Sequence, residues 1–371
     1  MANDLTRPAL AGLVPYEPGK PVEEVQRELG LDRVVKLASN EGQFGPFPAA
    51  IEALERGLPE LNRYPDGGAF RLVTALAGKH GVEPENVAVA GGADAVVNYL
   101  SMALLDPGDE VVCGWPSFPS YVLDAAKMGA TAVRVPLTGH RYDVERILAA
   151  VTDRTKIAYL CNPNNPTGTM ISRAEVDAFL AGVPAHVLTV LDEAYHEYVE
   201  EPEYPDGIEE HLKAGRRVLV LRTFSKIYGL AGLRVGYGIG PAEVVDAIKK
   251  VRNAFDVTQP AQDAAVASLG DGEELARRRR QNDEARARLV GACEELGLSV
   301  ATPAVANFLY AEVGDDAGPV FEALLREGVI VRPLAGFGAP GAIRVTVGTL
   351  EETDLFAQAF RRVAATASTT A

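Results

Sequence analysis

The sequence predicts an α/β fold with a mainly parallel central sheet and a second, smaller α+β domain. Short apolar, β-rich segments alternate with helical segments through the middle of the chain. From about Asp271 the pattern changes to one long charged helix, which is followed by short strands and helices. A length of 371 residues also suits two domains, or one large domain with an appendage. Strand–helix alternation is typical of a parallel sheet with helices on both faces.

The predicted elements follow this division. Residues 1–35 are rich in proline and glycine around 15–21, and we expect them to form an N-terminal arm. Residues 36–255 should form the large domain, with strands at 87–90, 110–113, 132–135, 156–160, 187–191 and 216–222. Residues 256–371 should form the small domain, with helices at 273–296 and 319–327 and strands at 308–310, 329–331 and 343–346.

The composition excludes several classes of function. A formal net charge of −15 opposes nonspecific nucleic-acid binding, which needs a basic face. No apolar segment approaches the ~20 residues that span a bilayer, and the first ten residues lack an apolar signal core. The three cysteines lie far apart, so we expect reduced thiols in a cytoplasmic protein. Neither they nor the five histidines show a metal-binding spacing, and no metal is expected.

The strongest chemical signal is the segment 223–236. Lys226 follows a predicted buried strand and lies among hydroxyl-bearing and small residues. Desolvation lowers the pKa of such a lysine toward the neutral amine that attacks carbonyl groups. Thr223, Ser225 and Arg234 could hold an anion beside it, most simply a phosphate. The segment therefore predicts a lysine that forms a Schiff base with pyridoxal 5′-phosphate.

A second predicted strand ends in an acidic residue, Asp192, with Tyr195 three residues later. A carboxylate in that place can keep a pyridine nitrogen protonated, so that the ring withdraws electrons from a substrate carbanion. A helix cap would explain Asp192 equally well by itself. The presence of the Lys226 segment favours the catalytic interpretation.

Three further segments follow predicted strands. Residues 161–168 contain prolines and a glycine that form a rigid turn, from which Asn165 could reach a ring hydroxyl together with Tyr195. Two glycines precede a helix start where the amides of Ala93 and Asp94 could bind a phosphate. Phe118 could stack on a flat cofactor, although core packing is the alternative.

The remaining candidates are glycines and arginines. The glycine cluster at 236–240 is interpreted as structural, because no dinucleotide-binding fingerprint surrounds it. Arg332 and Arg344 lie within apolar predicted strands of the small domain. A buried arginine needs an anion, which an internal salt bridge or a substrate carboxylate or phosphate can supply. We favour substrate binding for both arginines.

Taken in order, these motifs resemble the class I/II (fold-type I) pyridoxal-phosphate aminotransferases over nearly the whole chain. Within that family the chain is most similar to the branch that acts on histidinol phosphate. The resemblance rests on residues 13–21, 36–41 and 62–66, the Asn-Pro-Thr-Gly turn at 165–168, the strand that ends at Asp192, and Ser225-Lys226. It implies transamination between histidinol phosphate and 2-oxoglutarate, as a step of histidine biosynthesis.

The resemblance also implies a role for each candidate residue. Lys226 would carry the cofactor, Asp192 would contact its pyridine nitrogen, and Phe118 would stack on its ring. The phenolic oxygen would be bound by Asn165 and Tyr195, and the phosphate by Ala93, Asp94, Thr223, Ser225 and Arg234. Tyr64 would reach the phosphate of a neighbouring subunit, which implies a homodimer with shared sites. The substrate would be bound by Tyr16, Asn40, Arg332 and Arg344.

The sequence departs from the family pattern in two places and leaves alternatives open. Residues 42–48 replace an Asn-Pro-containing version, and Asp94 stands where glutamate is common. An aromatic amino-acid aminotransferase would share most motifs, with Phe44 and Phe47 near the substrate ring. Decarboxylation or β-elimination on the same fold is a further alternative. A cofactor-sensing regulator is another, which the short arm and the acidic charge oppose.

Overall fold

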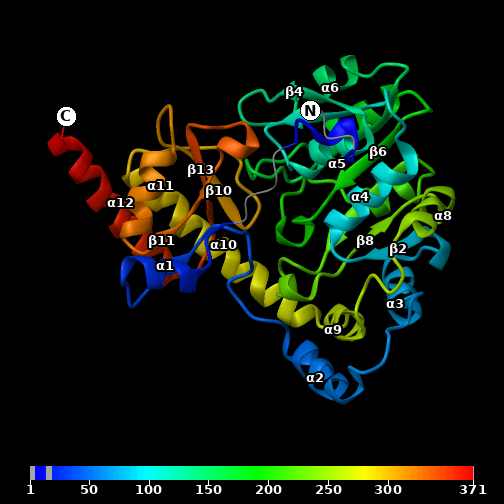
Figure 1. The fold of residues 1–371 in the computed structure, drawn as a ribbon, viewed down its shortest axis with the longest axis horizontal. Coiled ribbons are helices and arrows are strands. Elements are labelled where there is room, and N and C mark those ends of the chain that lie inside the picture. The colour runs from blue at the N-terminus through cyan, green and yellow to red at the C-terminus, as the bar shows by residue number, and fades with distance from the viewer. Residues whose placement is uncertain (1–4, 14–18, 371) are drawn as a thin grey trace.

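The computed structural model describes residues 5–13 and 19–370, and two β-sheets dominate it (Figure 1). The larger sheet has seven strands in the order β2-β8-β7-β6-β5-β3-β4. Its strands are β2 (Val87–Ala90), β3 (Glu110–Trp115), β4 (Thr131–Pro136), β5 (Thr155–Cys161), β6 (Leu188–Asp192), β7 (Val218–Thr223) and β8 (Gly236–Ile239). The predicted strands of the large domain are therefore confirmed to within two residues.

Helices surround this sheet. They are α2 (Pro48–Gly57), α3 (Phe70–His80), α4 (Ala93–Leu104), α5 (Ser120–Met128), α6 (Val144–Ala149), α7 (Arg173–Gly182), α8 (Ala242–Val251) and α9 (Gln259–Leu269). Every residue of β6 and β7 is buried, which requires cover on both faces of the sheet. Short helical turns lie at 8–10, 58–60, 84–86, 196–198, 207–212, 231–233 and 335–337. The predicted doubly covered α/β sheet is confirmed.

β8 is the one strand of the large sheet that runs antiparallel to both its neighbours, β2 and β7. The sequence analysis interpreted its glycines as structural but did not predict a strand, because glycine disfavours strands. The structure gives the reason for the glycines. A Cβ on Gly238 or Gly240 would come within 3.1–3.2 Å of Leu219, and one on Gly236 would collide with the start of α4. Close packing therefore requires glycine at Gly236 and favours it at Gly238 and Gly240.

The smaller sheet has four antiparallel strands in the order β12-β13-β10-β9. They are β9 (Ser299–Val300), β10 (Phe308–Glu312), β12 (Arg332–Pro333) and β13 (Ala342–Thr346), and the sheet is accompanied by α10 (Gly272–Glu295), α11 (Gly318–Arg326) and α12 (Leu350–Thr370). Figure 1 shows α10 extending from the small domain toward the large one. The side chain of Asp271 caps α10 by accepting from the Glu274 amide, and Gly297 follows the helix with a φ of +73°.

The chain before the large sheet contributes to the small domain. Helix α1 (Val22–Leu29) lies within the predicted arm, and its Val25 packs with Leu325 and Ile330. Strand β1 (Val35–Lys36) pairs in parallel with β11 (Val329–Ile330). The boundaries at 35/36 and 255/256 stay a prediction. Two sets of contacts bear on these boundaries. β1 pairs with β11 of the small domain, and α9 packs on α2 and α3 of the large domain.

Among the described residues, none of the helices combines the length and apolar character that a bilayer crossing requires.

Replacing Gly236 with alanine is expected to lower the midpoint of thermal unfolding. The new methyl would collide with the backbone nitrogen of Ala93 and lie 2.7 Å from the carbonyl carbon of Gly92. Overpacking of this kind costs about 1–3 kcal/mol. Gly291→Ala is the matched control, because nothing lies within 4 Å of its added Cβ in α10 and alanine favours a helix. A midpoint for Gly236→Ala equal to that of the unmodified protein would contradict this packing.

Candidate active site

The predicted site residues gather around one cavity of about 940 Å³. It lies at the carboxyl ends of the parallel strands, where ligands bind in sheets of this kind, and residues of the small domain complete its wall. The predicted residues that line it are Asn40, Ala93, Asp94, Phe118, Asn165, Asp192, Tyr195, Thr223, Ser225, Lys226, Arg234, Arg332 and Arg344. Tyr64 is not among them, and Tyr16 lies outside the described residues.

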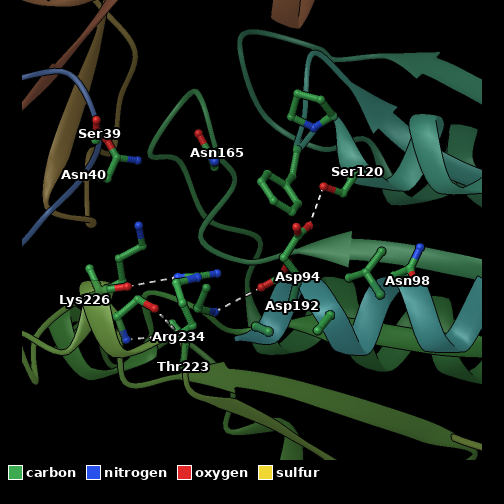
Figure 2. A pocket seen from close by; sticks show the side chains of 18 of the residues that line it. Ser39, Asn40, Asp94, Asn98, Ser120, Asn165, Asp192, Thr223, Lys226 and Arg234 are labelled. Atoms are coloured by element: carbon green, nitrogen blue, oxygen red, sulfur yellow. Dashed lines mark hydrogen bonds between the residues drawn. The ribbon is translucent and has the colours of Figure 1, made fainter. Parts of the chain in front are cut away.

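Lys226 follows β7 and extends into this cavity (Figure 2). The hydrophobic residues beside it anchor the segment, since Phe224 is fully buried and packs on Tyr228 and Tyr237. The ammonium lies 5.6 Å from the centre of the Tyr195 ring. Although Lys226 keeps some surface toward the cavity, desolvation by the surrounding protein lowers its pKa to about 8, and the charge of Arg344 adds to that effect. The site therefore makes a neutral, nucleophilic amine available near neutral pH.

One end of the cavity is built to hold an anion. Helix α4 begins there after Gly92, whose φ is +98°. A Cβ at Gly92 would lie 2.6 Å from Nη2 of Arg234, so glycine is what allows the guanidinium to approach the helix start. The hydroxyl of Thr223 donates to that of Ser225 at 3.0 Å in the same wall. Backbone N–H groups, hydroxyls and a guanidinium together suit a phosphate.

Asp94 has an acidic side chain beside this anion site. Its Oδ1 accepts a hydrogen bond of 2.5 Å from the hydroxyl of Ser120, the first residue of α5 (Figure 2). The carboxylate is therefore engaged with α5, and its place in the first turn of α4 also suits the helix dipole.

Asp192 ends β6 and lies almost wholly buried in the floor of the cavity. Its Oδ1 accepts from the amide of Ala194 at 3.1 Å, and its Oδ2 accepts from the hydroxyl of Tyr121 at 2.5 Å. Burial raises the pKa of Asp192, and the two hydrogen bonds oppose that shift by favouring the carboxylate. A cationic group placed against Asp192 would be strongly stabilised in this low-dielectric place.

Asn165 and Tyr195 also line the cavity. Arg344 donates to Oδ1 of Asn165 at 2.5 Å, which leaves the amide nitrogen of Asn165 as its donor toward a ligand. The hydroxyl of Tyr195 accepts from Nδ2 of Asn40 at 3.0 Å. Burial raises the pKa of Tyr195, so the hydroxyl keeps its proton and can donate it. The pair can therefore bind an oxyanion on a ring.

Arg332 and Arg344 face the same cavity from the small domain. They are directly opposed across the antiparallel pair β12–β13, so both side chains lie on one face of the sheet. Both guanidinium groups lie within 5.5–5.7 Å of the Phe337 ring centre, and Nη2 of Arg344 also donates to the carbonyl of Ala38 at 2.8 Å. The result is a doubly cationic wall on the small-domain side of the cavity.

The two aromatic residues predicted to contact the cofactor, Phe118 and Tyr64, lie in different places. Phe118 lines the cavity and packs edge-on against Tyr121, with ring centres 5.6 Å apart. Tyr64 is 83% exposed and stacks on Phe255 at 4.7 Å, outside the cavity of its own chain. A role for Tyr64 would therefore need a second subunit.

Two features of the site were missed by the sequence analysis. Tyr121, which donates to Asp192, stood in the aromatic segment from which only Phe118 was selected. The sequence feature that could have identified Tyr121 is its position three residues after Phe118, at the start of α5. The second feature is a buried ion pair in which Nη2 of Arg222 lies 2.7 Å from Oε2 of Glu193. The sequence shows Arg222 directly before Thr223 and Glu193 directly after Asp192, but no sequence pattern indicates that these two residues form an ion pair.

The residues that the structure describes hold no group of three or more His, Cys, Asp or Glu side chains that could bind a metal ion. All three cysteines are buried free thiols.

Comparison with known proteins gives a consistent result. The family model for aminotransferase class I and II matches residues 32–360. The chain is 45% identical to a histidinol-phosphate aminotransferase of Moorella thermoacetica, over 97% of this chain and 93% of that protein. It is 47% identical to histidinol-phosphate aminotransferase 2 of Carboxydothermus hydrogenoformans, over 93% and 95% of the two chains.

Solved structures agree with the sequence comparisons. A histidinol-phosphate aminotransferase of Sinorhizobium meliloti, in complex with pyridoxal-5′-phosphate, superposes with a TM-score of 0.88 at 30% identity and covers 98% of each chain. A mutant aspartate aminotransferase of Thermus thermophilus gives 0.85 at 27% identity, over 96% of this chain and 99% of that one.

The reaction of Lys226 with pyridoxal phosphate is expected to accelerate as pH rises and to level off above about 8. Only the neutral amine attacks a carbonyl, and a pKa of about 8 makes roughly a tenth of Lys226 neutral at pH 7. Stopped-flow absorbance on cofactor-free protein measures this rate. Nα-acetyl-lysine in the same buffers is the control and should keep accelerating past pH 10. Identical pH profiles for protein and control would contradict the desolvated environment of Lys226.

Proposed function

The chain belongs to the class I and II aminotransferases, and from this premise we propose that it transfers the amino group of histidinol phosphate to 2-oxoglutarate in histidine biosynthesis. Its relatives with that name at 43–47% identity support the choice of donor. The observation that carries the proposal is the opposed pair Arg332 and Arg344. Two guanidinium groups on one face suit a doubly charged phosphate better than one would.

The described residues that line the cavity suit pyridoxal phosphate. Its phosphate fits the anion site at the start of α4, which Gly92 keeps open for Arg234. Asp192 would hold the ring nitrogen, with Phe118 against the ring face. Asn165 and Tyr195 would bind the phenolic oxygen. When bound, pyridoxal phosphate supplies an electron sink that stabilises the charge left on a substrate carbon after a proton is removed.

Lys226 has two tasks in this proposal. Its amine would hold the cofactor covalently until a donor amine binds. Because its pKa is lowered to about 8, part of the released amine is neutral near neutral pH, and this form could act as a general base at the substrate Cα. The ammonium so formed could return that proton, and a water molecule is then needed to release the keto product. The buried carboxylate of Asp192 would favour a positive charge at the ring nitrogen.

The substrate wall must accept two donors, histidinol phosphate and glutamate. Arg344 can form two parallel hydrogen bonds to a carboxylate or a phosphate, and Arg332 adds a second positive charge. Asn40 lines the cavity and donates to the hydroxyl of Tyr195, so it could position that hydroxyl and also contact the substrate.

The alternative amino donor, an aromatic amino acid, is not supported by the residues that were expected to bind its ring. Phe44 and Phe47 were the residues proposed to surround its ring, but neither lines the cavity. Phe47 is fully buried against Tyr228, and Phe44 lies beneath Arg277 and Arg278 at 5.0 and 5.4 Å.

Histidinol phosphate is expected to convert the cofactor-loaded enzyme faster than phenylalanine does. The doubly cationic wall stabilises the phosphate, whereas phenylalanine has only an α-carboxylate. Single-turnover loss of the cofactor absorption band measures both donors on one preparation. L-histidinol without its phosphate is the matched control and should react poorly. Faster conversion by phenylalanine would overturn the proposed donor, and release of CO₂ or ammonia without a keto product would overturn transamination.

We also propose a homodimer with shared sites that acts in the cytoplasm. Tyr64 is one of several exposed large apolar side chains between residues 51 and 70, with Ile51, Leu58, Leu61 and Phe70. Exposed apolar side chains that gather on a surface are typical of an interface. A second subunit seated there would bring Tyr64 to the phosphate of its neighbour. The buried thiols suit a reducing compartment.

Mixing two inactive variants tests this arrangement. Tyr64→Ala and Lys226→Ala subunits should each be impaired alone, and hybrid dimers should regain activity, because one site then holds intact Lys226 and Tyr64 from different chains. Refolding the two together and assaying transamination gives the result, with each variant refolded alone as control. Elution as a monomer, or no gain on mixing, would contradict shared sites.

A further inference from the structure

Tyr121 holds the one side-chain hydrogen bond to Asp192 found among the described residues. It is the second residue of α5 and is fully buried. Its hydroxyl donates to Oδ2 of Asp192 at 2.5 Å, while the amide of Ala194 donates to Oδ1. Each carboxylate oxygen therefore has a fixed donor, which sets the rotation of the carboxyl group.

The ring of Tyr121 is itself held from two sides. It stacks on Tyr159 with ring centres 4.1 Å apart and planes 9° apart. Phe118 packs edge-on against it at 5.6 Å. Tyr121 therefore contacts two residues proposed to bind the cofactor. One is Phe118, which would lie against the face of the cofactor's ring, and the other is Asp192, which would pair with its ring nitrogen. A side chain packed in this way keeps its hydroxyl where Asp192 needs it.

The hydroxyl of Tyr121 stays protonated at neutral pH. Burial and the charge of Asp192 raise the pKa of Tyr121, so it acts as a donor and not as a second anion. A donor to a carboxylate stabilises the charged form and makes that carboxylate a weaker base. The Asp192 carboxylate and the ring nitrogen compete for one proton, so a weaker carboxylate leaves the proton on nitrogen.

We propose that Tyr121 is a positioning residue that keeps Asp192 ionised and so keeps the proton on the cofactor's ring nitrogen. The inference rests on the use of pyridoxal phosphate but not on the identity of the donor. Without the hydroxyl, the proton moves toward Asp192 and the ring becomes a poorer electron sink. Removal of the substrate Cα proton then slows, while donor binding at the arginine wall is unchanged.

Tyr121→Phe tests this role, because it removes the hydroxyl and keeps the ring. The readout is the ¹⁵N chemical shift of the ring nitrogen in enzyme loaded with ¹⁵N-labelled pyridoxal phosphate. We expect the shift to move from the protonated toward the unprotonated position. We also expect kcat to fall about tenfold or more with KM changed less than twofold, since a hydrogen bond to a charged group is worth that factor.

Tyr159→Phe is the matched control. It removes a buried hydroxyl from the stacked neighbour, and that hydroxyl makes no hydrogen bond to Asp192. Its ¹⁵N shift and kcat should equal those of the unmodified enzyme. The proposal is overturned if Tyr121→Phe keeps the unmodified ¹⁵N shift, or if Tyr159→Phe changes shift and kcat equally. The nitrogen signal does not depend on the donor, so it separates this inference from the proposed substrate.

Discussion

The register of three neighbouring parallel strands, β5, β6 and β7, determines where the reacting groups lie. Cys161 at the end of β5 pairs with Asp192 at the end of β6, and Asp192 pairs with Leu221 in β7. The segments that follow these strands therefore leave the sheet at its carboxyl end, and they bring Asn165 and Lys226 to the same cavity. The ion pair between Arg222 and Glu193 ties the ends of β6 and β7 together, and breaking such a buried pair costs about 3–5 kcal/mol.

Charge explains how an acidic protein binds anionic ligands. The chain carries a net charge of −15, yet Lys226, Arg234, Arg332 and Arg344 all line one cavity. Concentrating cations in a concave, partly desolvated place focuses a positive field there. Burial, together with the charges of Arg344 and Arg234, lowers the pKa of Lys226, so part of the charge that attracts substrate also prepares the nucleophile.

Much of the site could be predicted from the sequence because its residues follow strands. Lys226, Asp192 and Asn165 each stand just after an apolar segment, and parallel strands end at one edge. What could not be predicted depends on contacts between distant segments. The hydrogen bond from Tyr121 to Asp192 spans 71 residues and that from Arg344 to Asn165 spans 179, and no local pattern specifies either. β8 was missed because close packing against Leu219 and α4 overrides the weak strand propensity of glycine.

The measurement that tests the account most directly is turnover of a Lys226→Ala variant loaded with pyridoxal phosphate. If Lys226 both holds the cofactor and moves the proton, the variant should bind the cofactor noncovalently, because the anion site and Asp192 remain. Its turnover should fall at least about a thousandfold, as the general base and the covalent step are both lost. An added small primary amine should restore part of the rate. Turnover close to that of the unmodified enzyme would contradict the assignment of Lys226.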